Sequence, residues 1–160
     1  MFIDRAVVDV IAGPGGAGAC SFRREKFVPK GGPDGGTGGH GGSVYVRADT
    51  NLATLLDYRY QTKWEAERGQ HGKHKNMTGR SGADLHLPVP AGTEVRDAAT
   101  GELIGEAVDP EQPLLVARGG RGGRGNASFA TPTHRSPREW EPGREGEERR
   151  LELVLKLIAD

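Results

Sequence analysis

The stretches GGTGGHGG, at residues 35–42, and RGGRGGRG, at residues 118–125, repeat every three residues. Three residues per turn is the period of polyproline II, an extended left-handed helix without internal hydrogen bonds. At this period the paired glycines leave bare edges where neighbouring backbones can approach and form hydrogen bonds. The third position of each repeat falls along one edge, and in the second stretch it is always arginine. The pattern predicts an ordered bundle of polyproline II helices.

Glycine supplies 26 of the 160 residues, against an average usage of about 7%. The glycines are clustered at residues 13–18, 31–42, 69–82 and 119–125. A flexible linker is the ordinary interpretation of such sequence. These stretches, however, are poor in serine and alternate with strand-like segments throughout the chain. Collagen shares the period, but the repeats last only a few turns and contain little proline, so we favour the bundle.

Short alternating segments between the glycine stretches predict β-strands. The clearest is residues 149–158, where leucines at 151, 153, 155 and 157 fall on one face and Glu152 and Lys156 alternate with them. Thr100 and Gly101 predict a hairpin turn, and residues 52–56 predict one helical turn. Many short, closely spaced strands favour a small barrel or sandwich. The other expected strands are residues 2–11, 43–48, 85–90, 93–97, 102–107 and 113–117.

Charge and cysteine usage limit the class of protein. The formal net charge is zero, so total charge gives no argument for nucleic acid. A single cysteine, Cys20, allows no intramolecular disulfide and no cysteine-rich zinc module, which favours a reducing compartment. Asp4, Arg5 and Asp9 interrupt the apolar run that a signal peptide needs, and no stretch approaches the roughly 20 apolar residues of a membrane span. We expect a soluble, cytoplasmic protein without membrane partners.

Two glycine patterns resemble nucleotide-binding motifs but lack their structural context. The G-x-G-x-x-G pattern occurs at residues 13–18 and 120–125, and neither copy is followed by a sequence that can sustain the required helix. A phosphate loop is absent, since the pair Gly72–Lys73 is followed by histidine and lacks the earlier glycine. We therefore expect this chain to bind no GTP, magnesium or other cofactor.

No catalytic or metal site is expected either. His71 and His74 are three residues apart, but no third soft ligand lies near them in the sequence. Cys20 could be a thiol nucleophile, although a lone cysteine is more often a small packed residue. We assign no catalytic residue and no metal ligand.

Basic residues are separated from acidic ones along the chain, which suggests basic loops on an acidic body. The acids concentrate at residues 94–111 and 139–148. Cations on glycine-hinged loops suit a cleft lined by phosphates, although charge runs often only solvate loops. Three separate clusters favour RNA. The candidate RNA-binding residues are Arg23, Arg24, Lys26, Lys30, Arg68, His71, Lys73, His74, Lys75, Arg80, Arg121, Arg124, Asn126, His134, Arg135 and Arg138.

Taken in order, these segments resemble the N-terminal domain of the Obg family of ribosome-associated GTPases. The resemblance is carried by residues 2–46, by LATLLDYRY at residues 52–60, by residues 72–106 and by residues 114–160, so it covers nearly the whole chain. It implies an Obg fold over residues 1–160, in which six left-handed polyproline II helices pack on an eight-stranded β-barrel. A GTPase domain, with the GTP and magnesium sites, would follow residue 160 in the full-length protein.

The resemblance also implies a function. Three loop tips, at residues 22–32, 68–82 and 126–138, would enter the peptidyl-transferase region of the large ribosomal subunit and compete with a tRNA acceptor end. We therefore predict a monomeric rRNA-binding domain, with its GTPase domain in cis, that acts in ribosome assembly and stress-linked control. The alternatives are a protein-interaction module that binds through the acidic body and a disordered RGG-type RNA binder. The third alternative is an enzyme, and nothing in the sequence supports an active site.

Overall fold

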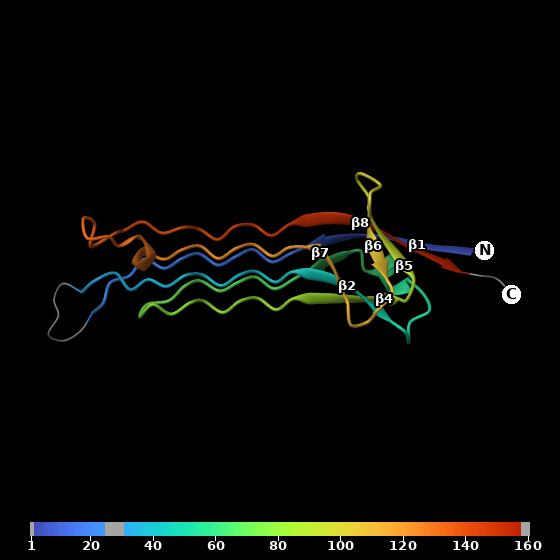
Figure 1. Cartoon of the computed structure of the whole chain (residues 1–160), viewed down its shortest axis with the longest axis horizontal. Helices are drawn as coiled ribbons and strands as arrows, with labels where there is room; N and C mark the ends of the chain where they lie inside the picture. Colours follow the sequence, from blue (N-terminus) through green and yellow to red (C-terminus); the bar gives the residue numbers. More distant parts are fainter. Residues whose placement is uncertain (1, 25–30, 158–160) are drawn as a thin grey trace.

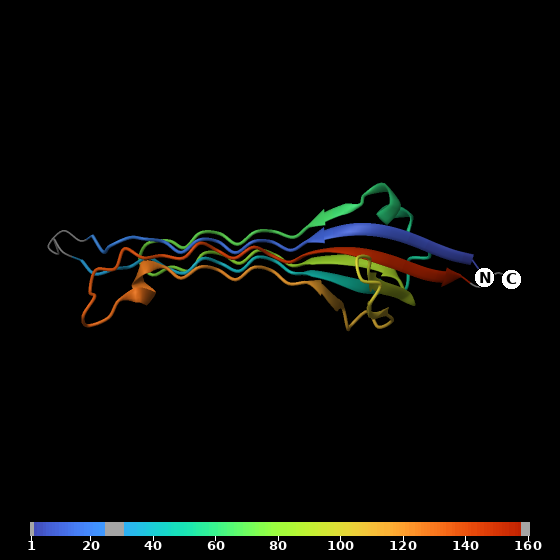
Figure 2. The ribbon, with the colours of Figure 1, turned by 90° about the horizontal axis from the view of Figure 1, so that it is seen from above.

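The computed structural model describes residues 2–24 and 31–157 and is mainly β. β-sheets form one end of an elongated molecule, and long extended segments run side by side from them to the other end (Figure 1). The same division is seen after a turn of 90° (Figure 2). Within the described ranges, no helix has the length and apolar character of a membrane span.

Within residues 2–24 and 31–157, eight strands form two sheets. The first has the order β3-β1-β8-β5-β6, and β1 pairs with β8 in ten antiparallel residue pairs, from Phe2↔Leu157 to Ile11↔Glu148. The second has the order β4-β2-β7, with β2 parallel to β4 and antiparallel to β7. The strands are β1 Phe2–Ile11, β2 Val44–Asp49, β3 Lys63–Glu65, β4 Leu85–Pro90, β5 Thr93–Asp97, β6 Leu103–Ala107, β7 Leu114–Ala117 and β8 Glu148–Leu157.

The hydrophobic core lies between the two sheets. Its members alternate along the strands, as Val8 and Val10 do in β1 and Leu151 and Leu153 do in β8, and each of these four is almost fully buried. Tyr58 of the short helix α1 (Leu56–Tyr60) also joins this cluster. The predicted closed eight-stranded barrel is not confirmed, because the eight strands are divided between two sheets that do not close into one.

Six extended segments, which we call the shaft, occupy the other part of the described chain. Their backbone hydrogen bonds recur every three residues. The N–H groups of Gly36, Gly39 and Gly42, for example, bond the carbonyls of Lys73, Gln70 and Glu67 at 2.8–2.9 Å. Because such segments make no internal hydrogen bonds, these bonds between neighbours satisfy the backbone. The shaft segments are residues 12–20, 34–42, 66–73, 76–84, 118–126 and 141–147.

Glycine permits this packing because the backbones touch. A Cβ added at Gly38 would lie under 3.0 Å from the carbonyl of Gly16, and one at Gly39 equally close to the carbonyl of Arg80. Real Cβ atoms essentially never approach so closely. Between such glycines the third position points outward, and Arg118, for example, is exposed. The repeated glycines are therefore required by the packing.

The topology places three loops at one end of the molecule. The chain leaves the sheets from β1, β3 and β7 and returns into β2, β4 and β8, so each excursion consists of one outward and one returning shaft segment. Each excursion reverses direction at the end remote from the sheets (Figure 1). We call this end the tip. It consists of loop 1 (residues 21–33, of which 25–30 lie outside the described residues), loop 2 (residues 74–75) and loop 3 (residues 127–140).

Most predicted strands are confirmed to within a residue or two, and so is the Thr100–Gly101 turn, where Gly101 has a φ of 75°. The predicted helical turn at residues 52–56 begins later, at Leu56. The cause lies outside the local sequence. The buried carboxylate of Asp4 accepts a hydrogen bond from the N–H of Leu55 (2.9 Å), which fixes the start of α1. Sequence analysis missed β3 and the 3₁₀-helix η1 (Asn126–Phe129).

Candidate nucleic-acid interface

Asn126, at the start of η1, fastens loop 1 and loop 3 to the shaft. Its side chain is fully buried, and its Oδ1 accepts a hydrogen bond from the N–H of Gly35 (2.8 Å). Its Nδ2 donates to the carbonyls of Ser21 (2.9 Å) and Pro137 (3.1 Å). The sequence predicted that Asn126 contacts RNA, which stays a prediction, and the structure shows its buried amide joining loop 1, loop 3 and the shaft. Its role in the structure is to position the loops.

Asp34 connects loop 1 to loop 2. Its carboxylate accepts hydrogen bonds from the hydroxyl of Ser21 (2.6 Å) and from the N–H of Lys75 (3.1 Å), and its carbonyl accepts one from the N–H of Asn76 (2.7 Å). The Ser21 hydrogen bond is the main cause that lowers the pKa of Asp34 below its ordinary value of 3.8. Lys75 and Asn76 adopt left-handed φ angles of 57° and 56°, and these hydrogen bonds hold the tight turn.

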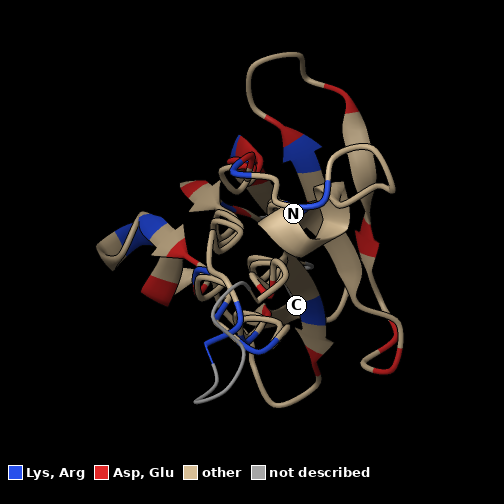
Figure 3. Cartoon of the chain, turned by 90° about the vertical axis from the view of Figure 1, so that its left-hand side faces the viewer, with Lys and Arg blue, Asp and Glu red and all other residues tan. Residues whose placement is uncertain are grey.

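A pocket of about 750 Å³ opens where the three loops meet. Loop 1 contributes Arg23 and Arg24, loop 2 contributes His74 and Lys75, and loop 3 contributes Arg138. Figure 3 faces this end and shows the blue of Lys and Arg in the loops nearest the viewer. Five of the predicted RNA-binding residues, distant in sequence, therefore line one cavity. Its other lining residues are Cys20, Ser21, Phe22, Asp34 and Asn76.

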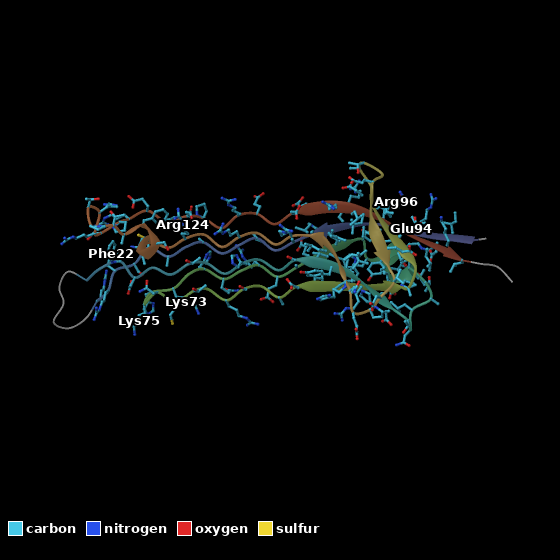
Figure 4. The ribbon with its side chains drawn as sticks, viewed as in Figure 1. Phe22, Lys73, Lys75, Glu94, Arg96 and Arg124 are labelled. Atoms are coloured by element: carbon cyan, nitrogen blue, oxygen red, sulfur yellow. The ribbon has the colours of Figure 1, made fainter. Side chains whose placement is uncertain are left out.

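Four predicted residues of the second basic cluster lie on the shaft and not in loop 2. Lys73 occupies the last shaft position before loop 2 and is exposed, and Figure 4 shows it and Lys75 near the end of the molecule. Arg80 and Arg68 lie further from loop 2 and are also exposed. The Nδ1 of His71 accepts a hydrogen bond from the N–H of Ala17 (3.2 Å), so only its Nε2 is available to a ligand.

The arginines of the RGG repeat form an exposed flank along the shaft. Arg124 pairs with Glu141 (2.9 Å), and its guanidinium lies 4.4 Å from the ring centroid of Phe129. The Arg124 hydrogen bond is the first cause that lowers the pKa of Glu141. Arg121 and Arg144 line the adjoining groove of about 490 Å³. Arg124 is thus partly neutralised within the chain, whereas no carboxylate of the described residues pairs with Arg121.

Loop 3 contains two further predicted residues, His134 and Arg135. The Nε2 of His134 pairs with the carboxylate of Glu139 (3.0 Å), and this hydrogen bond is the main cause that lowers the pKa of Glu139. The Nε of Arg135 donates to the carbonyl of Pro132 (3.2 Å). Both side chains are exposed. Lys26 and Lys30, the last predicted residues of loop 1, lie outside the described residues.

Acidic residues are less separated from basic ones than the sequence suggested. Glu94 and Arg96 pair with each other at 3.3 Å in β5, among the sheets, and Figure 4 shows them far from the tip. The second acidic cluster does not lie on the sheets alone. Glu141 and Glu147 belong to the last shaft segment, where their carboxylates accept hydrogen bonds from the N–H groups of Arg124 (3.0 Å) and Arg118 (2.8 Å). Part of the acidic charge therefore stabilises the shaft.

Two important residues of the tip pocket, Phe22 and Asp34, were missed by the sequence analysis. Phe22 lies in the pocket wall, with the Arg138 guanidinium 5.8 Å from its ring centroid. An aromatic residue directly before two arginines was the available signal. Asp34 had no such signal, because its partners become visible only in the folded chain. In the described residues, no group of three His, Cys, Asp or Glu side chains is placed to hold a metal ion.

The family model and the similar proteins found by comparison agree on one family. Residues 3–157 match the family model described as GTP1/OBG. The chain is 59% identical over 160 residues to a protein of Chloroherpeton thalassium named GTPase Obg, covering 100% of this chain and 48% of that protein. It is 57% identical over 159 residues to the GTPase Obg of Chlorobium chlorochromatii, covering 99% of this chain and 47% of that protein. The chain spans about half the length of the curated relatives it matches.

Proposed function

Because the chain belongs to the GTP1/OBG family, we propose that it is the rRNA-binding domain of a GTPase that acts in assembly of the large ribosomal subunit. The tip would bind ribosomal RNA near the peptidyl-transferase region. One observation carries the proposal: three loops, far apart in sequence, converge on a pocket lined by Arg23, Arg24, Lys75 and Arg138. Binding to ribosomal subunits would place the protein in the cytoplasm.

The shape of the shaft supports this proposal. We infer that its six segments are polyproline II helices, since their hydrogen bonds repeat every three residues. At about 3.1 Å per residue, such segments extend on the order of 25–30 Å from the sheets. A narrow, hydrogen-bonded shaft can carry cations into an RNA cleft that would exclude a globular body, and each phosphate contact made there releases counterions.

The remainder of the activity belongs to the intact protein. The relatives named GTPase Obg are about twice as long as this chain, and this chain's sequence contains no phosphate loop. We propose that GTP and magnesium are bound by a further domain in the full-length protein. The GTP state of that domain would determine how long the tip stays on the subunit.

Co-sedimentation with separated ribosomal subunits tests the proposal. The 160-residue chain should pellet with large subunits and remain in the supernatant with small ones, and added salt should release it. Pelleting with neither subunit, or equally with both, would refute large-subunit binding. The protein-interaction alternative predicts association that is insensitive to salt. The disordered RGG alternative predicts no cooperative thermal transition, whereas the interlocked shaft predicts one.

A further inference from the structure

The tip pocket has features that phosphate contacts alone do not require. Its volume of about 750 Å³ lies within the range of sites that enclose a small organic ligand, roughly 300–1,000 Å³. It combines cations from three loops with an aromatic ring, that of Phe22. A surface that only follows an RNA backbone needs neither a cavity nor a ring.

The cations of the pocket are available to an anion. Arg24 and Lys75 are exposed, and no carboxylate of the described residues pairs with either. Asp34 is the single acid among the described lining residues, and both its carboxylate oxygens already accept hydrogen bonds, from Ser21 and from the N–H of Lys75. The acid therefore holds the loops in place, and the balance of charge in the pocket remains positive.

The aromatic ring of the pocket differs from its neighbour at the tip. Arg124 lies directly over Phe129, 4.4 Å from the centroid, so that face is already occupied. The Arg138 guanidinium lies 5.8 Å from the centroid of Phe22, close to the roughly 6 Å limit of a cation–π contact. Phe22 is half-buried and lines the pocket together with Arg24 and Lys75, whereas Phe129 does not line it, so a planar group that stacks on Phe22 would share the cavity with these cations.

We propose that the tip pocket binds one unpaired nucleotide of the RNA, with its base stacked on Phe22 and its phosphate held by Arg24, Lys75 and Arg138. This inference rests on the proposed function and adds the kind of RNA that the tip recognises. Bases inside an A-form duplex are stacked on each other, whereas bases in loops and bulges can splay out onto an aromatic side chain. The tip should therefore prefer single-stranded RNA to duplex.

Fluorescence anisotropy of the whole chain with labelled RNA tests this preference. The probes are an oligouridylate of eight nucleotides and an eight-base-pair RNA duplex. We expect tighter binding to the single strand. Phe22→Leu should weaken that binding by about 5- to 100-fold, the range expected when one base–aromatic stack is lost, and Phe22→Trp should retain it. Phe129→Leu is the matched control at the same end and should change the affinity less than twofold.

Thermal melts of each variant separate loss of binding from loss of folding. Equal affinity for the two probes, absence of binding to either, or wild-type affinity of Phe22→Leu for the single strand would each overturn the nucleotide pocket. Large-subunit pelleting of the same proteins distinguishes this failure from failure of the proposed function. If the wild-type chain pellets with large subunits while Phe22→Leu leaves oligonucleotide affinity unchanged, only the pocket inference fails.

Discussion

The carboxylate of Asp34 accepts a hydrogen bond from the backbone N–H of Lys75 at 3.1 Å, which joins two of the three tip loops. With the hydrogen bond from Ser21, this arrangement lowers the pKa of Asp34 below 3.8. A carboxyl whose pKa is lower in the folded than in the unfolded state stabilises the fold at pH values above its unfolded pKa. That stabilisation is lost as the pH falls through the folded pKa.

Asp34→Asn should therefore remove a pH-dependent contribution to stability. Above pH 4 the wild type should have the higher melting temperature, and the difference should shrink as the pH falls below the unfolded pKa, near 3.8. Thermal melts from pH 7 to pH 2.5 measure this difference. A difference in melting temperature that stays the same at every pH would show that the negative charge of Asp34 does not stabilise the contact between loop 1 and loop 2.

Gly39→Ala should strongly destabilise the shaft, because a Cβ there meets the carbonyl of Arg80. We expect a loss of about 3 kcal/mol or more in the free energy of unfolding, the size typical of severe steric conflict. Gly32→Ala is the matched control, since nothing lies within 4 Å of its added Cβ. That change should remain within about 0.5 kcal/mol. Urea denaturation provides both values, and equal stabilities would rule out the tight packing.

Asn126→Ala should lower stability by about 3 kcal/mol, because it leaves several buried hydrogen-bonding groups unsatisfied at about 1–3 kcal/mol each. Large-subunit binding should fall together with stability, since loops 1 and 3 lose their common anchor. Asn51→Ala, at an exposed turn, serves as the control. If Asn126→Ala weakens binding while its urea midpoint stays at the wild-type value, Asn126 contacts RNA directly.

Lys73→Ala with Lys75→Ala should weaken large-subunit binding and flatten its salt dependence. Each lost phosphate contact reduces the slope of log affinity against log salt by roughly 0.7–0.9, so the pair should remove about one to two units. Arg5→Ala with Arg47→Ala removes the same charge from exposed positions of β1 and β2. Pelleting across a potassium series measures both. An equal loss of large-subunit affinity in the two double variants would show that total charge, and not the position of the lysines, determines binding.

This chain should not bind GTP, because its sequence contains no phosphate loop. Isothermal titration with GTP and magnesium should give only heats of dilution, while the folded state remains intact by circular dichroism. Saturable binding in the micromolar range would contradict this prediction. Such binding would make the G-x-G-x-x-G pattern at residues 13–18 a candidate nucleotide site again.

The repetitive parts of the fold could be predicted from sequence. The period-three glycines predicted close packing of extended segments because only glycine fits where backbones touch. Leu151 and Leu153 revealed the buried face of β8 by strict alternation. The start of α1 could not be predicted, because it depends on the carboxylate of Asp4, some 51 residues away in sequence from Leu55.

The sequence predicted which loops and which residue types form the candidate site, but not which of these residues come together in the pocket. Arginine and lysine clusters identified the three loops, yet the sequence did not separate residues that line the pocket from those on the shaft. Asn126 illustrates the reason, because it lies 105 residues from Ser21 and bonds to it only in the folded chain. A polar residue in a basic loop can face a ligand or fasten the loop, and its burial distinguishes the two.

The interlocked glycines also constrain how the length of the shaft can vary. Each hydrogen-bonded repeat advances the chain by three residues, or about 9 Å in polyproline II geometry. An insertion of one or two residues into a single segment would bring side chains, in place of glycines, against neighbouring carbonyls. An insertion of three residues into both segments of one excursion would keep that phase but push its loop about 9 Å beyond the other two. The distance from the sheets to the tip can therefore change, with the three loops kept in line, only when all six segments gain or lose whole three-residue repeats together.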